Sequence, residues 1–397
     1  MNRPAIIGSS ALPVGRYQTP DDAEHHVVEH ELLAKLVVDA IASAGVDKSD
    51  VSSIICAQPR SYTRQKYFST FMANYLRLQC EGIVMETFGN GLTAALAFDK
   101  ALDEILLGRA KVVLALAINM ETSTPSSEHM KDSLRTTGDV DFHAPSGFTP
   151  ISWYAMDAMR YMHEYNVPRT ALASVAVKNR LHASLNPLAQ YRDPITLEDV
   201  LKQRTIVEPL GLYEVPPRGD GACVVVIASE DVAKSLKKPY SVVRGRGFFH
   251  EGAHQINEVP NSMIDFVAAQ RASATAYANA GVTVADIDFA EIYAPCTIVE
   301  VLASEAIGLT TRGRGAFSAE EGVTTLGGAI PISTSGGLTS RGHPPYATPL
   351  YNAYEVNEQL CSMAGERQVA DARLGLLMNE LGNYNAALIH ILEAMSP

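Results

Sequence analysis

The order of strand and helix patterns is the feature that most restricts how this chain can fold. Residues 92–107 have helical periodicity, and residues 112–118 (Val-Val-Leu-Ala-Leu-Ala-Ile) are apolar without alternation. Such an uninterrupted run indicates a strand that is buried on both faces. Strand patterns also lie at residues 5–10, 54–57 and 223–229, and a helix pattern lies at residues 29–44. The alternation predicts an α/β sandwich with helices on both faces of its sheets.

The second half of the chain repeats this order. Its strand patterns lie at residues 241–247, 287–292 and 386–392, and its helix patterns lie at residues 263–280, 298–307 and 350–363. Between the halves, residues 119–219 break the rhythm with a polar Thr-Ser-Pro stretch and two helical patterns, at residues 153–165 and 170–184. We call residues 119–219 the excursion. Long insertions often cover active sites, so we expect the excursion to do so.

Composition limits the classes of function. The formal net charge of -12 and a pI near 5.4 argue against nucleic acid as the main partner. No apolar run reaches the length of a membrane span, and we expect no secretory leader. The five cysteines are scattered without a Cys-x-x-Cys pair, which favours a reducing, cytoplasmic location and neither a disulfide framework nor a metal site.

One histidine lies in a run of glycines and hydroxyl residues, Ser333-Thr-Ser-Gly-Gly-Leu-Thr-Ser-Arg-Gly-His-Pro344. Glycines such as Gly336 and Gly337 let the backbone approach a ligand closely, so we take them as candidate substrate-binding residues. His343 in such a loop can act as an acid or a base near neutral pH. The alternative is a histidine that only caps the following helix.

The combination of motifs resembles the thiolase superfamily, in which a Gly-His-Pro histidine follows a Gly-Gly-x-x-Pro-x-x-x-x-Gly-Gly stretch. Gly327 to Pro331 and the run that ends at Pro344 match that pattern, and Asp220-Gly221-Ala222 matches the end of the family's first half. The resemblance covers the whole chain and is closest to the sterol-carrier-protein thiolase-like branch. It implies a five-layered αβαβα sandwich of two duplicated halves with an inserted loop domain, and a homodimer.

The resemblance also implies domain boundaries. Residues 1–118 and 220–238 would form the N-terminal half, residues 119–219 the inserted region, and residues 239–397 the C-terminal half.

The residue that carries covalent chemistry in typical thiolases is missing. Their reactive cysteine lies at the start of a buried helix, where the helix N-terminus lowers the pKa of the thiol. In the matching stretch, Val84-Met-Glu-Thr-Phe-Gly-Asn-Gly91, that place is taken by Phe88. Phenylalanine has no nucleophilic atom, so an acyl-enzyme at this position is excluded. Cys80 and Cys296 are the alternatives as nucleophiles, and each is more typical of a buried apolar position.

Other site residues follow from the same resemblance. Tyr293, in Tyr293-Ala-Pro-Cys-Thr297, takes the place of the family's Asn or His and would act with His343. The family's second acid–base residue falls at or near Asn379, and Tyr346 is a possible further acid–base group. Backbone N–H groups near Phe88 and Gly382 would hold a thioester oxygen.

Three functions remain open. The first is retro-aldol cleavage of a β-hydroxyacyl-CoA, because some relatives that cleave steroid side chains also lack the cysteine and have tyrosine where Tyr293 stands; it would place the chain in lipid metabolism. The second is an accessory subunit whose pocket Phe88 plugs. The third is an acyltransferase with another nucleophile. The two enzymes would take a CoA thioester as substrate, the accessory subunit would bind acyl-CoA or a partner, and no cofactor is expected to be bound covalently. Under all three functions the resemblance implies a partner made of a zinc ribbon and an OB-like domain.

Overall fold

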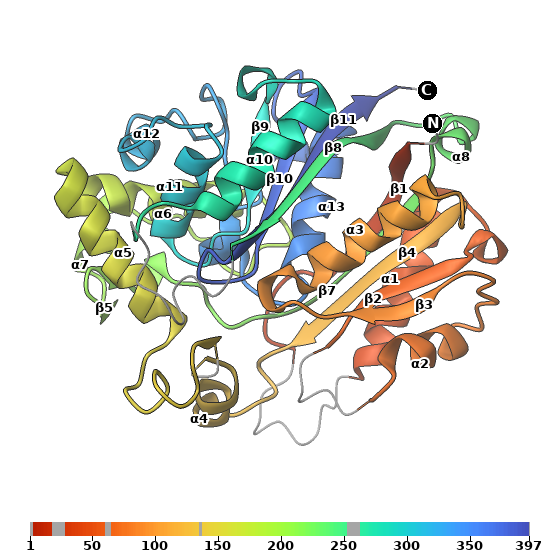
Figure 1. Ribbon diagram of the computed structural model, residues 1–397, viewed down its shortest axis with the longest axis horizontal. Helices are drawn as coiled ribbons and strands as arrows, with labels where there is room; N and C mark the ends of the chain where they lie inside the picture. The colour runs from red at the N-terminus through yellow and green to blue at the C-terminus, as the bar shows by residue number, and fades with distance from the viewer. Residues whose placement is uncertain (1–2, 18–27, 60–64, 135–136, 252–262, 397) are drawn as a thin grey trace.

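The computed structural model describes residues 3–17, 28–59, 65–134, 137–251 and 263–396. Its helices and strands alternate as the sequence predicts (Figure 1). The first half contains β1 (Pro4–Ala11), α1 (Glu29–Ala44), β2 (Ser53–Ala57), α2 (Phe68–Tyr75), β3 (Val84–Thr87), α3 (Thr93–Leu106), β4 (Val112–Met120), β7 (Asp220–Ser229) and α8 (Glu230–Ser235). The second half contains β8 (Tyr240–His250), α10 (Val267–Ala280), β9 (Phe289–Ile292), α11 (Thr297–Ala306), α12 (Gly315–Glu320), α13 (Thr348–Leu360), β10 (Leu374–Glu380) and β11 (Ala386–Met395).

The strand order shows that the two halves are duplicates. Strands β2, β4, β7 and β1 are neighbours in the first half, and β9, β10, β11 and β8 are neighbours in the second. In each set the first pair is parallel and the other two pairs are antiparallel. Even β3, which pairs with β2, has a counterpart in the single bridge between Ala290 and Ile332. The predicted duplication is therefore present at the level of topology.

Five layers follow from where the helices pack. Helices α1 and α2 cover the outer face of the first half, and α10 and α11 cover that of the second. Between them, α3 and α13 contact each other and share one core with strands of both halves. The two sets of strands are not fully separate, because β1 and β8 pair at two positions, Ala5 with Val242 and Ile6 with Ser241. Hydrogen bonding is therefore continuous along one edge of the sandwich.

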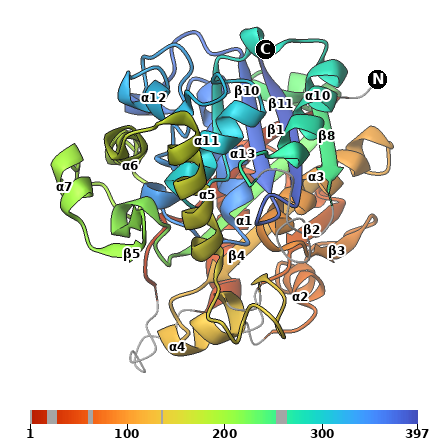
Figure 2. The same ribbon diagram turned by 60° about the vertical axis from the view of Figure 1, so that its left-hand side comes forward.

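The excursion adds two 16-residue helices and several short elements to one side of this sandwich. It contains α4 (Ser126–His129), α5 (Pro150–Tyr165), α6 (Arg169–Ser184), α7 (Leu197–Lys202), β5 (Thr205–Val207) and β6 (Leu210–Gly211). Helices α5 and α6 lie against α11, and α6 also contacts α12 (Figures 1 and 2). Within the described ranges, no helix is both long and apolar enough to cross a membrane.

Candidate active site

A cavity of about 240 Å³ lies where the excursion meets the loops of both halves. The first half contributes the turn before α3, and the second contributes the loops after β9 and β10 and the loop that carries His343. Much of the wall is apolar and comes from the excursion, including Met130, Leu134 and Ile151. The expectation that the excursion covers the candidate site is confirmed by this lining.

Tyr293 and His343 meet in this cavity although they are far apart in the sequence. The Tyr293 Oη atom lies 3.4 Å from His343 Nε2, and their rings are nearly perpendicular at 77°. On the other side of the imidazole, Nδ1 lies 3.1 Å from the Thr348 hydroxyl oxygen. That hydroxyl donates its one hydrogen to the Pro344 carbonyl, so it accepts from Nδ1–H. When the ring is neutral, it therefore presents the lone pair of Nε2 to the Tyr293 hydroxyl.

The loop that carries His343 is fixed by its backbone. Gly342 has a φ of 105°, and a Cβ there would lie 2.5 Å from a methyl carbon of Val14. Both facts require glycine immediately before His343. The helix that follows begins at Thr348, five residues later, so His343 contacts the helix start through its ring and is not the capping residue.

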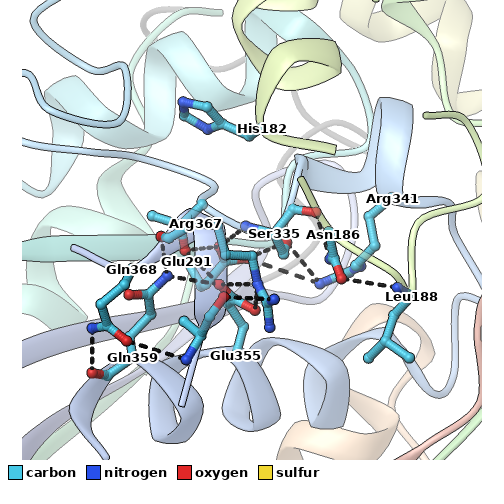
Figure 3. Close-up of polar contacts among 12 residues, drawn as sticks. His182, Asn186, Leu188, Glu291, Ser335, Arg341, Glu355, Gln359, Arg367 and Gln368 are labelled. Carbon is cyan, nitrogen blue, oxygen red and sulfur yellow. Dashed lines mark hydrogen bonds and ion pairs between the residues drawn. The ribbon is translucent and has the colours of Figure 1, made fainter. Parts of the chain in front are cut away.

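A buried network of charged groups joins this loop to the strand that precedes Tyr293 (Figure 3). Glu291 on β9 accepts hydrogen bonds from the backbone N–H and the hydroxyl of Ser335, each at 2.8 Å. Arg341 donates to the Ser335 hydroxyl oxygen at 3.2 Å. Arg367 pairs with Glu355 at 2.9 Å. Burial raises the pKa of Glu291 to about 7; Glu355 raises it further and Arg341 opposes the shift. The network fixes β9, which leads to Tyr293, relative to the loop that carries His343.

Glu380, which the sequence analysis did not single out, also lines the cavity. It is the last residue of β10 and is fully buried. Its Oε2 accepts hydrogen bonds from the backbone N–H groups of Gly382 at 2.7 Å and Tyr384 at 3.3 Å. Burial raises the pKa of Glu380 to about 7, against the lowering effect of hydrogen bonds from Gly382, Tyr384 and Tyr154.

Asn379, the predicted second acid–base position, does not line the cavity. Successive side chains of a strand point to opposite faces. The side chain of Asn379, which precedes Glu380, therefore points away from the cavity. Asn379 is fully buried, and its Oδ1 accepts a hydrogen bond from Asn352 of α13 at 3.4 Å. The acid–base role proposed for this stretch therefore fits Glu380 better than Asn379.

Gly336 and Gly337 are buried against α6 and are not among the cavity-lining residues. A Cβ at Gly336 would lie 2.5 Å from the Cβ of Ala183, and one at Gly337 would lie 3.0 Å from the Asn179 amide nitrogen. Both have positive φ values, 101° and 59°. Their small size serves close packing of the loop on a helix, so the substrate-binding assignment has no support in this geometry.

Phe88 lies beside the site and not in it. Its side chain is 64% exposed, it does not line the cavity, and its ring contacts that of Tyr346 edge to face at 5.8 Å between centroids. Tyr346 is itself buried and outside the lining, and its backbone N–H donates to Asn119 at 3.0 Å. The expectation that Phe88 lines or plugs the cavity is therefore wrong, because its ring is exposed to solvent beside Tyr346.

Cys296 does line the cavity, at the position before α11. Its thiol is buried, and burial raises its pKa well above the usual range, with Glu214, Asp157 and Glu380 adding to the shift. Because the thiolate is the nucleophile, this environment opposes acyl transfer through Cys296. Cys80 is outside the lining, and burial raises its pKa as well.

Neither of the two predicted backbone donors, near Phe88 and Gly382, is supported by the geometry. The Gly382 N–H already donates to Glu380, so it does not point to a substrate oxygen. The Asn90 side chain lines the cavity at the same place, with its amide nitrogen 3.2 Å from where a Cβ on Gly382 would stand. Gly91 holds this turn in place, because a Cβ there would lie 2.4 Å from the Glu380 carbonyl oxygen and its N–H donates to Leu381 at 3.0 Å. Asn90 is thus a donor that the sequence motif did not reveal.

Known families and structures agree with this architecture. The thiolase N-terminal domain matches residues 5–231, and the thiolase C-terminal domain-like family matches residues 251–394. The chain belongs to the thiolase superfamily. The predicted family and fold are thereby confirmed. Among the described residues, no group of three or more His, Cys, Asp or Glu side chains is arranged to hold a metal ion.

Relatives of this thiolase-like chain have more than one activity in their names. The acetyl-CoA acetyltransferase of Methanothermobacter thermautotrophicus is 30% identical over 393 residues, 98% of both chains. Benzoylsuccinyl-CoA thiolase subunit BbsB of Thauera aromatica is 34% identical over 63% of each chain. Human sterol carrier protein 2 is 29% identical over 346 residues. These residues make up 82% of this chain and 61% of that protein.

Two solved structures resemble the thiolase-like chain throughout. The Ltp2–ChsH2(DUF35) aldolase has a TM-score of 0.82 at 25% identity and covers 99% of this chain and 98% of that one. A monomeric SCP2-thiolase-like protein type 1 from Mycobacterium smegmatis has a TM-score of 0.71 at 16% identity, over 98% of this chain and 77% of that one, which supports the fold alone.

Proposed function

We propose that this thiolase-like protein cleaves a carbon–carbon bond of a β-hydroxyacyl-CoA by retro-aldol reaction, without an acyl-enzyme. The observation that carries the proposal is the Tyr293–His343 pair in a cavity whose one cysteine, Cys296, has a strongly raised thiol pKa. A retro-aldol reaction needs a base and donors for an enolate but no covalent nucleophile. The likeness to an aldolase structure at a TM-score of 0.82 supports the same reading.

The geometry suggests a role for each group. Tyr293 oxygen takes the proton of the β-hydroxyl as its own proton passes to His343 Nε2, which faces it. The oxygen lone pair of the substrate then forms a carbonyl, and the electron pair of the Cα–Cβ bond moves into the thioester enolate. The Asn90 amide, at the same end of the cavity as Gly382, donates to the enolate oxygen. The apolar excursion wall holds the acyl group.

The partners proposed for the chain are an acyl-CoA, a second copy and a small protein. Strand β3 ends the strand order of the first half, so its outer edge is available for a second copy within the described part of the chain. The solved aldolase has a DUF35 chain in its name, which supports a zinc-ribbon and OB-like partner for this chain. The M. smegmatis relative is described as monomeric, so oligomeric state is a direct test. We propose a cytoplasmic location.

Acyl transfer is the second candidate, because an acetyl-CoA acetyltransferase is 30% identical over nearly the whole chain and Cys296 reaches the cavity. An accessory role is disfavoured by Phe88, which leaves the cavity open. The two catalytic candidates differ in whether the protein becomes acylated.

Mass spectrometry separates these functions. The protein is incubated with a panel of β-hydroxyacyl-CoA and acyl-CoA thioesters, alone and with a candidate partner, and both intact protein mass and small products are measured. The aldolase proposal expects a ketone or aldehyde plus a shortened acyl-CoA, and unchanged protein mass. An acyl adduct on Cys296 supports acyl transfer instead, and no product with any thioester or partner supports an accessory role.

A further inference from the structure

We infer that the buried carboxyl groups of Glu291 and Glu355 share one proton through the hydroxyl of Thr334, and that this proton positions the loop of His343 relative to Tyr293. Thr334 and Glu291 are then positioning residues, because neither touches the substrate. The effect on catalysis rests on the proposed function, whereas the existence of the shared proton does not.

The contacts of Thr334 require a proton on one of the two carboxyl groups. Its side chain is fully buried, and its Oγ1 atom lies 3.0 Å from Glu291 Oε1 and 3.0 Å from Glu355 Oε1. A threonine hydroxyl has one hydrogen to donate. If both carboxyl groups were ionised, one of these contacts would set a hydroxyl lone pair against an anionic oxygen, which is costly in a buried site. A protonated carboxyl removes the conflict, because it donates to Thr334 while Thr334 donates to the other carboxyl.

The donors around each carboxyl group indicate which one carries the proton. Arg367 Nε donates to Glu355 at 3.0 Å from Oε1 and 2.9 Å from Oε2, and the Gln359 amide donates to Oε1 at 3.0 Å. Such donors favour the ionised form of Glu355. The Glu291 oxygens accept from the Ser335 N–H and hydroxyl, and Arg341 Nη1 lies 3.9 Å from Oε2, too far for a hydrogen bond (Figure 3). Glu291 is therefore the group that holds the proton and donates it to Thr334.

The charges around the pair balance when this proton is present. Titratable or charged side chains reach the pair from α13, from the loop before His343, from the turn after α13 and from β7: Tyr351, Tyr354, Glu358, Arg341, Arg367 and Cys223. With Glu291 protonated, the two arginines balance the carboxylates of Glu355 and Glu358. Burial raises the pKa of Glu291 from 4.5 to about 7, with Glu355 adding to the shift and Arg341 opposing it. The folded protein thus keeps the proton below about pH 7 and loses it above.

The proton acts on the site through the two segments that it joins. Glu291 is two residues before Tyr293, and Thr334 lies near the start of the run that ends at His343. The segments are already paired at their ends, since the Ser333 N–H donates to the Ala290 carbonyl at 2.8 Å. The contact between Tyr293 Oη and His343 Nε2 is 3.4 Å, long for an O–H···N hydrogen bond, so a small shift of the loop is enough to break it. Loss of the proton sets Thr334 against one carboxylate and moves the loop away from β9.

Infrared spectroscopy tests the proton directly and needs no substrate. A protonated carboxyl group has a carbonyl band that is separate from those of carboxylates and amides. We expect such a band at pH 6, declining with an apparent pKa of about 7 and absent in Glu291→Gln. Thr334→Val should shift this band, because the carboxyl loses its acceptor, and Thr334→Ser should restore it. Burial also raises the pKa of Glu358 to about 7, so Glu358→Gln identifies the separate band of that residue.

The kinetics of the proposed cleavage test the positioning role. The ratio of kcat between wild type and Thr334→Val should be about tenfold larger at pH 6 than at pH 8, because for a pKa of about 7 the fraction that holds the proton changes by about that factor. Other titrating groups cancel in this ratio, and KM should change little. Thr334→Ser should behave as wild type.

The matched control is Thr324→Val. Thr324 is also buried, and its hydroxyl has no hydrogen-bond partner within the described ranges of the chain. Its kcat ratio to wild type should therefore be equal at pH 6 and pH 8, and its infrared band should be unchanged. Circular dichroism and gel filtration establish that each variant is folded. If no thioester is cleaved, ¹³C NMR of the Tyr293 ring, assigned with Tyr293→Phe, replaces kinetics: its shift between pH 6 and pH 8 should differ between wild type and Thr334→Val.

The outcomes separate this inference from the proposed function. A spectrum without a band that depends on Glu291, or with a band that Thr334→Val leaves unchanged, overturns the shared proton whether or not cleavage occurs. A shared proton with equal kcat ratios at both pH values, or without cleavage an equal Tyr293 shift in both proteins, overturns its positioning role. A shared proton and a Tyr293 shift that depends on Thr334, with no cleavage of any β-hydroxyacyl-CoA, support the inference and remove the retro-aldol proposal.

Discussion

Replacing Glu380 with glutamine should change how the stability of the protein depends on pH. In the folded protein the pKa of Glu380 is raised from an ordinary value of 4.5 to about 7, mainly by burial. Between these two values the folded state binds more protons than the unfolded state, so stability falls as pH rises through this window. Raising the pKa from 4.5 to about 7 corresponds to about 3 kcal/mol of unfolding free energy, at about 1.36 kcal/mol for each pKa unit.

Glutamine has nearly the same shape and keeps an oxygen for the N–H groups of Gly382 and Tyr384, but it does not ionise. The wild-type protein carries the cost of a buried carboxylate at pH 8 and not at pH 5. The stability of Glu380→Gln relative to wild type should therefore improve by up to about 3 kcal/mol between pH 5 and pH 8.

Urea unfolding of both proteins at pH 5 and pH 8, followed by far-ultraviolet circular dichroism, measures this difference. Because each comparison is made with wild type at the same pH, other titrating groups cancel. Glu320→Gln on α12 is the control, since this carboxyl is exposed and its relative stability should be equal at both pH values. A relative stability of Glu380→Gln that is the same at pH 5 and pH 8 would refute the reasoning about burial.

Three further predictions concern the same site. Tyr293→Phe and His343→Ala should each lower kcat for cleavage by ~10²–10⁴-fold with little change in KM, as steady-state kinetics would report. Phe88→Cys should give no acyl adduct in intact-protein mass spectra, because residue 88 is outside the cavity lining; an adduct there would contradict that placement. Arg341→Met should lower the unfolding free energy by about 3–5 kcal/mol, because it leaves the buried Glu291 carboxylate without its cation. The loss should be smaller at pH 5, where Glu291 takes up a proton, and urea titrations at both pH values check this.

Local patterns were sufficient to predict most of the sandwich. Helices α1 and α10 both end at a left-handed glycine, Gly45 and Gly281, as the sequence indicates, and β4 is buried along its whole length. Strands β3 and β10 were not predicted. The four residues of β3 are all half-buried at a sheet edge, without alternation, and pairing with β2 defines them. Such strands depend on tertiary contacts that no local pattern encodes.

The site residues were harder to predict than the fold, because each assignment depends on the exact position of one side chain. Matching motifs pointed to Asn379, but a shift of one residue along a strand reverses the face, and Glu380 is the residue at the cavity. The glycines at positions 336 and 337 suggested a ligand, but they accommodate α6, whose position the sequence does not reveal. Phe88 was assigned from the family motif, whereas its exposed side chain depends on the path of the turn before Asn90.

The candidate site gathers where parallel strands end. Strands β3 and β4 of the first half lead to the Asn90 turn and to Glu121, and β9 and β10 of the second half lead to Tyr293 and to Glu380 itself. Ligands of α/β folds are commonly held at such carboxyl ends, and the duplication brings two sets of them to one cavity. The position of the lost cysteine precedes the Asn90 turn, outside the lining. The proposed retro-aldol reaction needs no nucleophile at that position, and the two groups proposed for it, Tyr293 and His343, both line the cavity.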